Sequence, residues 1–127
     1  LHVRSRRQRQ MCIRDRRKVI TDIASKENCV IVGRCADYIL KDEPDCFNVF
    51  VWAPDDFRAH RIVEQYGASP VRPLKRLEEK DKKRKLNYRY FTGREWGERE
   101  NYHLCIDSSR VGIERAADLI IMAAEND

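Results

Sequence analysis

The chain has 127 residues, which is enough for one small domain with one hydrophobic core. Its apolar content of 42% favours a globular fold over an intrinsically disordered chain. The net charge of +5 comes from one end, because residues 1–18 hold eight basic residues and one acidic residue, which leaves eighteen basic and twenty acidic residues elsewhere. This distribution argues against a domain built for nucleic-acid binding.

Residues 1–16 lack apolar periodicity, and we expect them to form a disordered basic arm. The hexapeptide MCIRDR within the arm is similar to translated sequencing-adapter DNA, which indicates that the arm is foreign to the domain. We therefore begin the predicted domain at residue 17 and extend it to residue 127.

The cysteines and the apolar runs indicate where the protein resides. Five cysteines without a C-x-x-C pair favour a reduced, cytoplasmic protein over a disulfide scaffold. Their spacing to the three histidines predicts no metal site. No apolar run is long enough to span a membrane, and no apolar segment follows the basic start as it would in a secretory signal.

Strands and helices are expected to alternate from residue 17 onward. Three continuously apolar runs, residues 29–32, 47–52 and 103–106, are typical of buried parallel strands. The pattern predicts an α/β fold, in which a parallel sheet is flanked by helices. The expected helices cover residues 17–26, 34–40 and 55–66, a long basic segment between residues 73 and 92, and residues 111–124.

The segment 78–94 concentrates seven basic residues. On a helix, Lys80, Lys83 and Arg84 share one face, and clustered cations of this kind suit a polyphosphate ligand. The alternative interpretation is a solvated helix face without a ligand. Because ligands of parallel α/β sheets bind beyond the carboxyl ends of the strands, the position of this helix between the second and third strands favours phosphate chemistry.

Four segments, in this order, resemble the cytidylate kinase-like family of P-loop nucleoside monophosphate kinases: VGRCADYIL, NVFVWAPDDFRAHRI, EEKDKKRKLNYRYFTGREWG and NYHLCIDSSRVGIERAADLI. The resemblance covers about residues 17–125. It implies a P-loop kinase-like fold that transfers the γ-phosphoryl group of ATP, with Mg²⁺, to a nucleoside monophosphate, CMP or dCMP. The third segment is similar to the lid that closes over the phosphates, at about residues 78–97.

The glycine-rich phosphate loop of such kinases is missing from the sequence, since none of the five glycines stands in a G-x-x-x-x-G-K-[ST] pattern. We therefore expect an N-terminally truncated fragment that lacks the first strand and the P-loop and has no kinase activity of its own. Two other functions stay open: a P-loop-type kinase of another small acceptor, and a basic nucleic-acid-binding module that uses aromatic residues for stacking.

The resemblance assigns phosphate-stabilising roles to four lid cations: Lys80, Lys83, Arg84 and Arg89. Ser108 and Ser109 are expected near the adenine edge of ATP, although a serine here could instead cap a helix that starts near Val111. Arg58 and Arg61, on the helix after the second strand, are interpreted as surface charges.

Three residues are expected to bind the acceptor nucleotide. Arg34 resembles the arginine that holds the acceptor phosphate, with a salt bridge to Asp37 as the alternative. Cys35 stands where the family's G-R-D motif has its aspartate, so Asp37 is expected either to pair with the cytosine amino group or to orient Arg34. Asp81 could accept a hydrogen bond from the acceptor base or sugar, or form an ion pair with Lys85 on its own helix.

Overall fold

The structure is a computed structural model that describes residues 6–67 and 72–125. The chain divides into two compact units, Leu1–Cys46 and Phe47–Asp127, and each unit is described by itself. Residues 1–5 of the expected arm and residues 68–71 between two of the expected helices lie outside the described residues.

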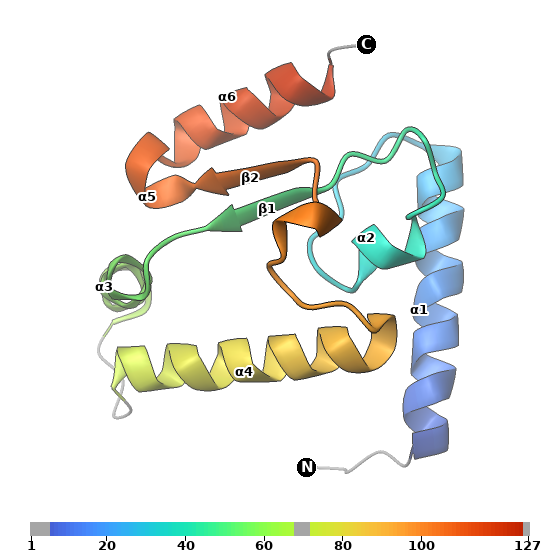
Figure 1. The fold of residues 1–127 in the computed structure, drawn as a ribbon, viewed down its shortest axis with the longest axis horizontal. Coiled ribbons are helices and arrows are strands. Elements are labelled where there is room, and N and C mark those ends of the chain that lie inside the picture. The colour runs from blue at the N-terminus through green and yellow to red at the C-terminus, as the bar shows by residue number, and fades with distance from the viewer. Residues whose placement is uncertain (1–5, 68–71, 126–127) are drawn as a thin grey trace. The chain divides into compact units, whose positions relative to one another are not determined.

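The first unit contains two helices, α1 (Arg6–Lys26) and α2 (Ala36–Ile39), shown in blue and teal in Figure 1. Ile20 of α1 is buried together with Ala36 and Leu40, and these three side chains form a small apolar core. Such a core is small for a segment of this length, so its helices depend strongly on local propensity.

Helix α1 begins at Arg6, whereas the sequence predicted a disordered arm up to residue 16 and a helix from residue 17. The arm was wrongly expected to be irregular over residues 6–16. This stretch contains neither glycine nor proline, and its arginines and glutamines have high helix propensity, so the helix extends backward without an apolar face. The foreign origin of the arm stays a prediction.

The run at residues 29–32 is not a strand, which corrects the expectation of a third parallel strand. Val30 and Val32 are 93% and 85% exposed, and Ile31 alone in this run packs against the small core. A strand requires a neighbour that completes its backbone hydrogen bonds, and an apolar run indicates a preference for burial without indicating that neighbour.

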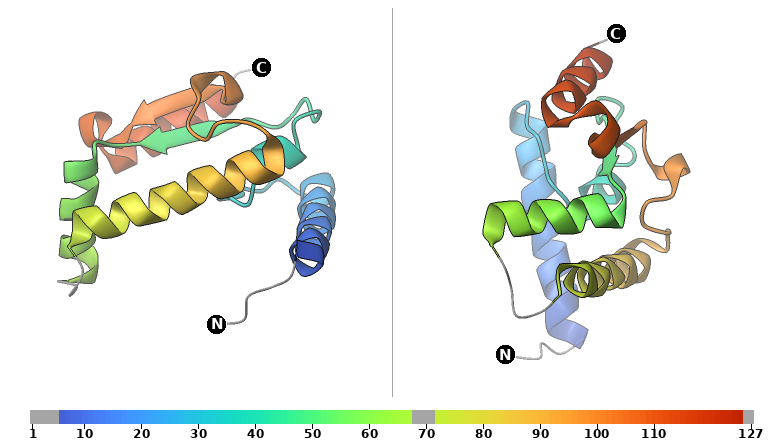
Figure 2. Two further views of the ribbon diagram at one scale, coloured as in Figure 1. Left: turned by 60° about the horizontal axis from the view of Figure 1, so that its bottom comes forward. Right: turned by 90° about the vertical axis from the view of Figure 1, so that its left-hand side faces the viewer.

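The second unit is built on a parallel pair of strands, β1 (Val49–Trp52) and β2 (Leu104–Asp107). Val49 lies opposite Leu104 and Trp52 opposite Asp107. The sheet of the described residues has these two strands, and it confirms the predicted parallel arrangement of the second and third apolar runs. In Figure 1 and in the right-hand view of Figure 2 the sheet lies between α6 (Ile113–Ala124) and α4 (Pro73–Thr92).

Proline and glycine set the bounds of the helices that follow β1. Helix α3 (Asp55–Tyr66) starts after Pro54 and ends at Gly67, whose φ is 77°. Helix α4 has Pro73 at its first position, where a missing N–H costs no hydrogen bond, and it ends at Gly93 in the left-handed conformation. These two helices pack against each other, and they place the candidate site described below.

The helix predicted over residues 111–124 is divided in two by Gly112, which has a φ of 85°. The short α5 (Ser108–Val111) follows β2 directly, and α6 begins after the glycine. Helix α2 is likewise shorter than the predicted segment 34–40, because Gly33, Arg34 and Cys35 all adopt positive φ before it. A positive φ interrupts a right-handed helix, so both breaks follow from the backbone.

The irregular segment after α4, which includes a 3₁₀ turn at Arg99–Asn101, covers one face of the sheet. The ring of Phe50 in β1 meets Trp96 edge-on at 5.2 Å and Tyr102 at 4.9 Å. Gly97 allows this approach, because a Cβ at that position would lie 3.3 Å from the Phe50 ring. Trp96 therefore serves packing, as does Tyr88, which is buried, and neither is presented for base stacking.

Candidate functional site

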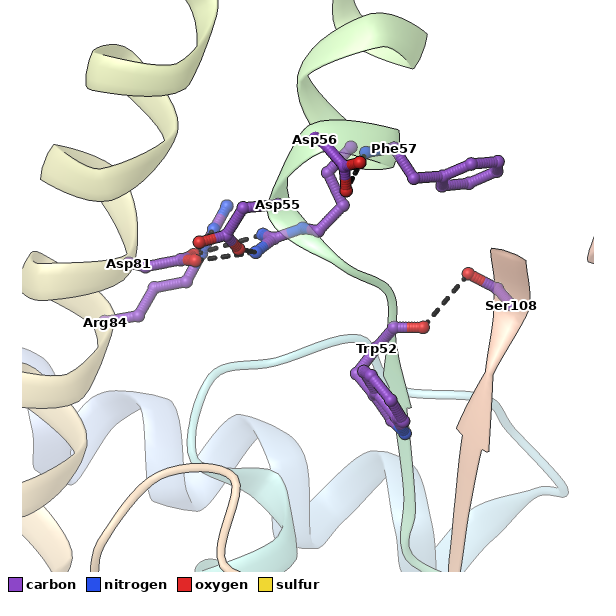
Figure 3. Close-up of polar contacts among 8 residues, drawn as sticks. Trp52, Asp55, Asp56, Phe57, Asp81, Arg84 and Ser108 are labelled. Atoms are coloured by element: carbon purple, nitrogen blue, oxygen red, sulfur yellow. Dashed lines mark hydrogen bonds and ion pairs between the residues drawn. The ribbon is translucent and has the colours of Figure 1, made fainter. Parts of the chain in front are cut away.

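Four charged side chains meet between α3 and α4, and we call them the Asp81 cluster: Asp55, Arg58, Asp81 and Arg84. Arg58 donates two hydrogen bonds to the Asp81 carboxylate, from Nη1 to Oδ2 at 2.6 Å and from Nη2 to Oδ1 at 3.1 Å. Arg84 Nη1 donates to the same Oδ1 at 2.8 Å. Asp55 lies 3.5 Å from Arg58 Nη1. Figure 3 shows Asp81 and Arg84 on α4 with Asp55 beside them on α3.

The two arginines stabilise the ionised form of Asp81. Hydrogen bonds from Arg58 are the largest influence, and together with those from Arg84 they hold the pKa of Asp81 below its ordinary value of 3.8, although partial burial acts in the opposite direction. The bond to Asp81 correspondingly raises the pKa of the Arg58 guanidinium. Asp81 and Arg58 are therefore both charged at neutral pH.

Exposure within the cluster increases from its centre outward. The side chains of Asp81 and Arg58 are 17% and 27% exposed, whereas that of Arg84 is 51% exposed. The inner pair lies at the packed junction of two helices, and the outer arginine reaches solvent. An anchored but accessible guanidinium is suited to bind phosphate oxygens, because its N–H donors lie in one plane with fixed directions.

The predicted lid cations all lie on α4, and the helix divides them into different environments. Arg84 lies one turn before the buried Tyr88 and two turns after the buried Leu77, through the spacing 77, 81, 84, 88, so it flanks the packed face. Lys80 and Lys83 share a face with Arg84 and are exposed. Arg89 is exposed and forms an ion pair with Glu95 at 3.2 Å, away from the cluster.

Asp81 has partners other than the one the sequence suggested. The proposed ion pair within the helix involved Lys85, whereas the structure shows bonds to Arg58 and Arg84. Arg58 was interpreted as a surface charge, which is wrong, because its guanidinium is bound in the helix junction. The sequence carries no local signal for this pair, since Arg58 and Asp81 are 23 residues apart.

A second polar group of residues lies where β2 meets α5. Ser108 is buried, and its hydroxyl donates to the carbonyl oxygen of Trp52 at 3.2 Å, which links the ends of the two strands (Figure 3). Asp107 Oδ1 accepts bonds from the Ser109 amide at 3.0 Å and the Ser109 hydroxyl at 2.6 Å. The helix cap is therefore Asp107 and neither serine. Both serine hydroxyls are occupied within the protein, and their predicted contact with adenine stays a prediction.

Of the two predicted acceptor residues of the first unit, Arg34 lies within a left-handed turn and Asp37 follows that turn. Gly33, Arg34 and Cys35 have φ values of 68°, 62° and 56°, and the amide of Ala36 donates to the carbonyl of Gly33 at 3.2 Å. For two non-glycine residues this conformation costs about 1–2 kcal/mol each. The Arg34 side chain is exposed at the turn, and Asp37 follows, partly buried, in α2. Strained turns of this kind often present functional side chains.

No group of three or more histidine, cysteine, aspartate or glutamate side chains is placed to hold a metal ion within residues 6–67 and 72–125. A Mg²⁺ ion that accompanies ATP keeps most of its contacts to phosphate oxygens and water, so it needs few protein ligands. The described helices also include none that is long and apolar enough to cross a membrane.

The family of this fold and site is shown by comparison with known proteins. The model of the cytidylate kinase-like family matches residues 3–110, so the chain belongs to that family. The match begins within the basic arm.

Two curated relatives carry the name cytidylate kinase. The one from Aeropyrum pernix is 29% identical over 110 residues, which are 87% of this chain and 62% of the relative. The one from Methanocaldococcus jannaschii is 28% identical over 114 residues, which are 88% of this chain and 63% of the relative. The chain thus spans less than two thirds of the length of these relatives.

A solved structure has the same fold. The crystal structure of an uncharacterised protein from Eubacterium ventriosum matches with a TM-score of 0.79 and 30% sequence identity, over 91% of this chain and 63% of that protein.

Proposed function

We infer that this chain is part of a nucleotide kinase that transfers the γ-phosphoryl group of ATP to a nucleoside monophosphate, with CMP or dCMP as the acceptor. Family membership supports the reaction class, and the names of the two curated relatives support the acceptor. The structural observation that carries the proposal is Arg84, which is anchored by Asp81 on one side and half exposed on the other.

Phosphoryl transfer requires positioned reactants and neutralised charge more than covalent chemistry from the protein. Arg84 is the cation best suited to stabilise the phosphoryl group in transit, because its orientation is fixed before the ligand binds. Lys80 and Lys83 supply point charges on the same face of α4, and Arg89 adds a further cation near the end of the helix. ATP would bring Mg²⁺ with its phosphates, and the metal would neutralise charge between them.

The acceptor nucleotide is proposed to bind at the turn before α2. Arg34 lies on a strained backbone at the turn, which fits a role in binding the acceptor phosphate, and Asp37 follows on the short helix α2. Ser108 and Ser109, whose hydroxyls are bonded to Trp52 and Asp107, are further candidates near the adenine of ATP.

The sequence lacks a G-x-x-x-x-G-K-[ST] loop, which in P-loop kinases cradles the phosphates of ATP with backbone N–H groups. We therefore expect the 127-residue chain to bind CMP without turning it over. With reduced cysteines and this activity, the protein is proposed to act in the cytoplasm.

Calorimetric titration of the chain with CMP, UMP, AMP and GMP tests this function. We expect CMP to bind most tightly, and Arg34→Gln to weaken it about tenfold, because a charged hydrogen bond to phosphate is lost. Arg17→Gln removes an exposed cation from the same unit and serves as the matched control. Equal losses in both variants, or no binding of any monophosphate, would contradict the proposal.

Titration with a single-stranded RNA oligonucleotide addresses the nucleic-acid alternative. If the chain binds RNA with a steep salt dependence and loses that affinity when residues 1–16 are deleted, the basic arm is a nucleic-acid-binding element and the kinase proposal fails.

A further inference from the structure

The Asp81 cluster contains one bond that joins two helices and one bond that does not. Arg58 on α3 reaches Asp81 on α4, so this pair holds the helices together. Arg84 and Asp81 lie three residues apart on the same helix, and their bond adds nothing to the contact between helices. A role in holding the two helices together therefore explains the position of Arg58 but does not explain that of Arg84.

The shared oxygen links the two arginines. Asp81 Oδ1 accepts from Arg58 Nη2 at 3.1 Å and from Arg84 Nη1 at 2.8 Å. A guanidinium is rigid and planar, so fixing one of its nitrogens limits the directions in which the others point. The direction of the accessible edge of Arg84 thus depends on where Oδ1 lies, and Oδ1 is fixed by the bidentate grip of Arg58.

We propose that Arg58 is a positioning residue for Arg84, because it fixes the Asp81 carboxylate that orients the Arg84 guanidinium toward a phosphate ligand. The inference rests on the proposed function in one respect, namely that Arg84 contacts the phosphoryl group. Arg58 itself is shielded in the helix junction, with 27% of its side chain exposed, and acts through Asp81 rather than on the ligand.

Charge supports the same assignment. An ionised Asp81 with Arg84 as its sole cation would compete with phosphate for that arginine. Arg58 neutralises the carboxylate from the other helix, and Asp55 at 3.5 Å balances Arg58 in turn. The net charge of the cluster is zero, so Arg84 remains available to an incoming anion at little electrostatic cost.

The test uses the whole chain and two measurements. The first is the NMR order parameter of the Arg84 Nε–Hε group without ligand, and the second is the dissociation constant of inorganic tripolyphosphate. The variants are Arg58→Met, Arg58→Lys, Asp81→Asn and Arg84→Met. Arg61→Met is the matched control, because Arg61 lies one turn further along α3 and its removal changes the net charge equally.

We expect Arg58→Met to lower the order of Arg84 and to raise the dissociation constant about three- to tenfold. Arg61→Met should change it by less than about twofold, because it alters only the screened field at Arg84 and removes no bond to Asp81. Arg58→Lys restores the charge but cannot bind both carboxylate oxygens, so it should recover the affinity only in part. In the Arg84→Met background, Arg58→Met should not change the dissociation constant further, because Arg58 affects binding only through Arg84.

Asp81→Asn gives a test of opposite sign. Removing a negative charge near an anion site tightens binding if electrostatics alone matters, whereas it weakens binding if Asp81 orients Arg84. Tighter binding, unchanged order of Arg84 in Arg58→Met, or additive losses in the double variant would each overturn the proposal. If the wild-type chain does not bind tripolyphosphate, the kinase proposal is lost, and the order of Arg84 alone decides the role of Arg58. Arg58→Lys keeps that measurement possible if Arg58→Met fails to fold.

Discussion

Two polar networks of the second unit centre on an aspartate that receives several hydrogen bonds, yet they differ in range. Asp107 is bonded by the amide and hydroxyl of Ser109, two residues away. Asp81 is bonded by Arg58 from 23 residues away and by Arg84 on its own helix. The first network closes a turn, and the second connects two helices to an accessible cation.

The difference shows that residue type alone does not mark a functional site. Serines after a strand suggested contact with a ligand, but their hydroxyls satisfy the backbone and the cap of α5. Arg84 is distinguished by being both anchored and 51% exposed, a combination that only the packed structure reveals. Anchoring lowers the entropy that a long side chain loses when it binds, which is why such an arginine can stabilise a transition state efficiently.

The largest expected effect is on catalysis by Arg84. In a version of the chain that begins with a family member's first strand and glycine-rich loop, Arg84→Ala should lower kcat about 10²–10³-fold, as for loss of one preorganised stabilising group. The effect on kcat should exceed that on CMP affinity, because the charge that Arg84 is proposed to neutralise develops in the transition state. Steady-state kinetics with CMP varied at saturating ATP measures both quantities.

Lys83→Ala is the control that sharpens this prediction, since Lys83 is the neighbouring cation and is exposed without a place in the Asp81 cluster. The Lys83→Ala variant should lose far less of its kcat than the Arg84→Ala variant. Equal losses would mean that the anchoring by Asp81 contributes nothing, and wild-type turnover in Arg84→Ala would identify the basic helix as a solvated face.

The second prediction concerns how the contribution of Asp81 to the stability of the fold depends on pH. The pKa of Asp81 is lower in the folded protein than its ordinary 3.8, so its ion pairs stabilise the fold above that pH and are lost as the pH falls through the folded value. Urea unfolding should show Asp81→Asn less stable than wild type by about 1–2 kcal/mol at pH 7, a figure reduced for partial exposure. The difference should shrink below pH 3.8.

Asp55 provides the comparison for this titration, because it also faces Arg58 but is 59% exposed and lies at the longer distance of 3.5 Å. Asp55→Asn should cost much less stability at pH 7 than Asp81→Asn, since exposed ion pairs contribute little. A stability difference for Asp81→Asn that stays constant from neutral pH to pH 3 would contradict the assigned role of its charge.

The sequence predicted those parts of the fold that local signals determine. Apolar runs indicated β1 and β2 as parallel strands, and the charge run lies on a long helix as expected. The same reasoning failed at residues 29–32, where an equally apolar run has no strand partner in the described structure. It also failed at Gly112, where one glycine divides a predicted helix.

The candidate site was predictable only in part for a similar reason. The family resemblance and the charge run pointed to α4 and to Arg84. The contact of Arg58 with Asp81 depends on how α3 crosses α4, which no spacing within either helix encodes. Local patterns therefore indicated the residues that are proposed to face a ligand, and tertiary packing was needed to identify Arg58 behind them.

The smallest expected effect belongs to the short-range network, at the cap of α5. Asp107→Ala removes the acceptor of two bonds from Ser109 and should lower the free energy of unfolding by about 1 kcal/mol, the usual cost of losing a helix cap. Ser109→Ala keeps the bond from the backbone amide to Asp107 and should cost about half as much or less. Neither change should alter the affinity for tripolyphosphate, because the cap has no contact with the Asp81 cluster in the described residues. If Asp107→Ala instead weakened anion binding as strongly as Asp81→Asn, the two networks would share one site, and the distinction between a closed structural turn and an anchored, accessible cation would not hold.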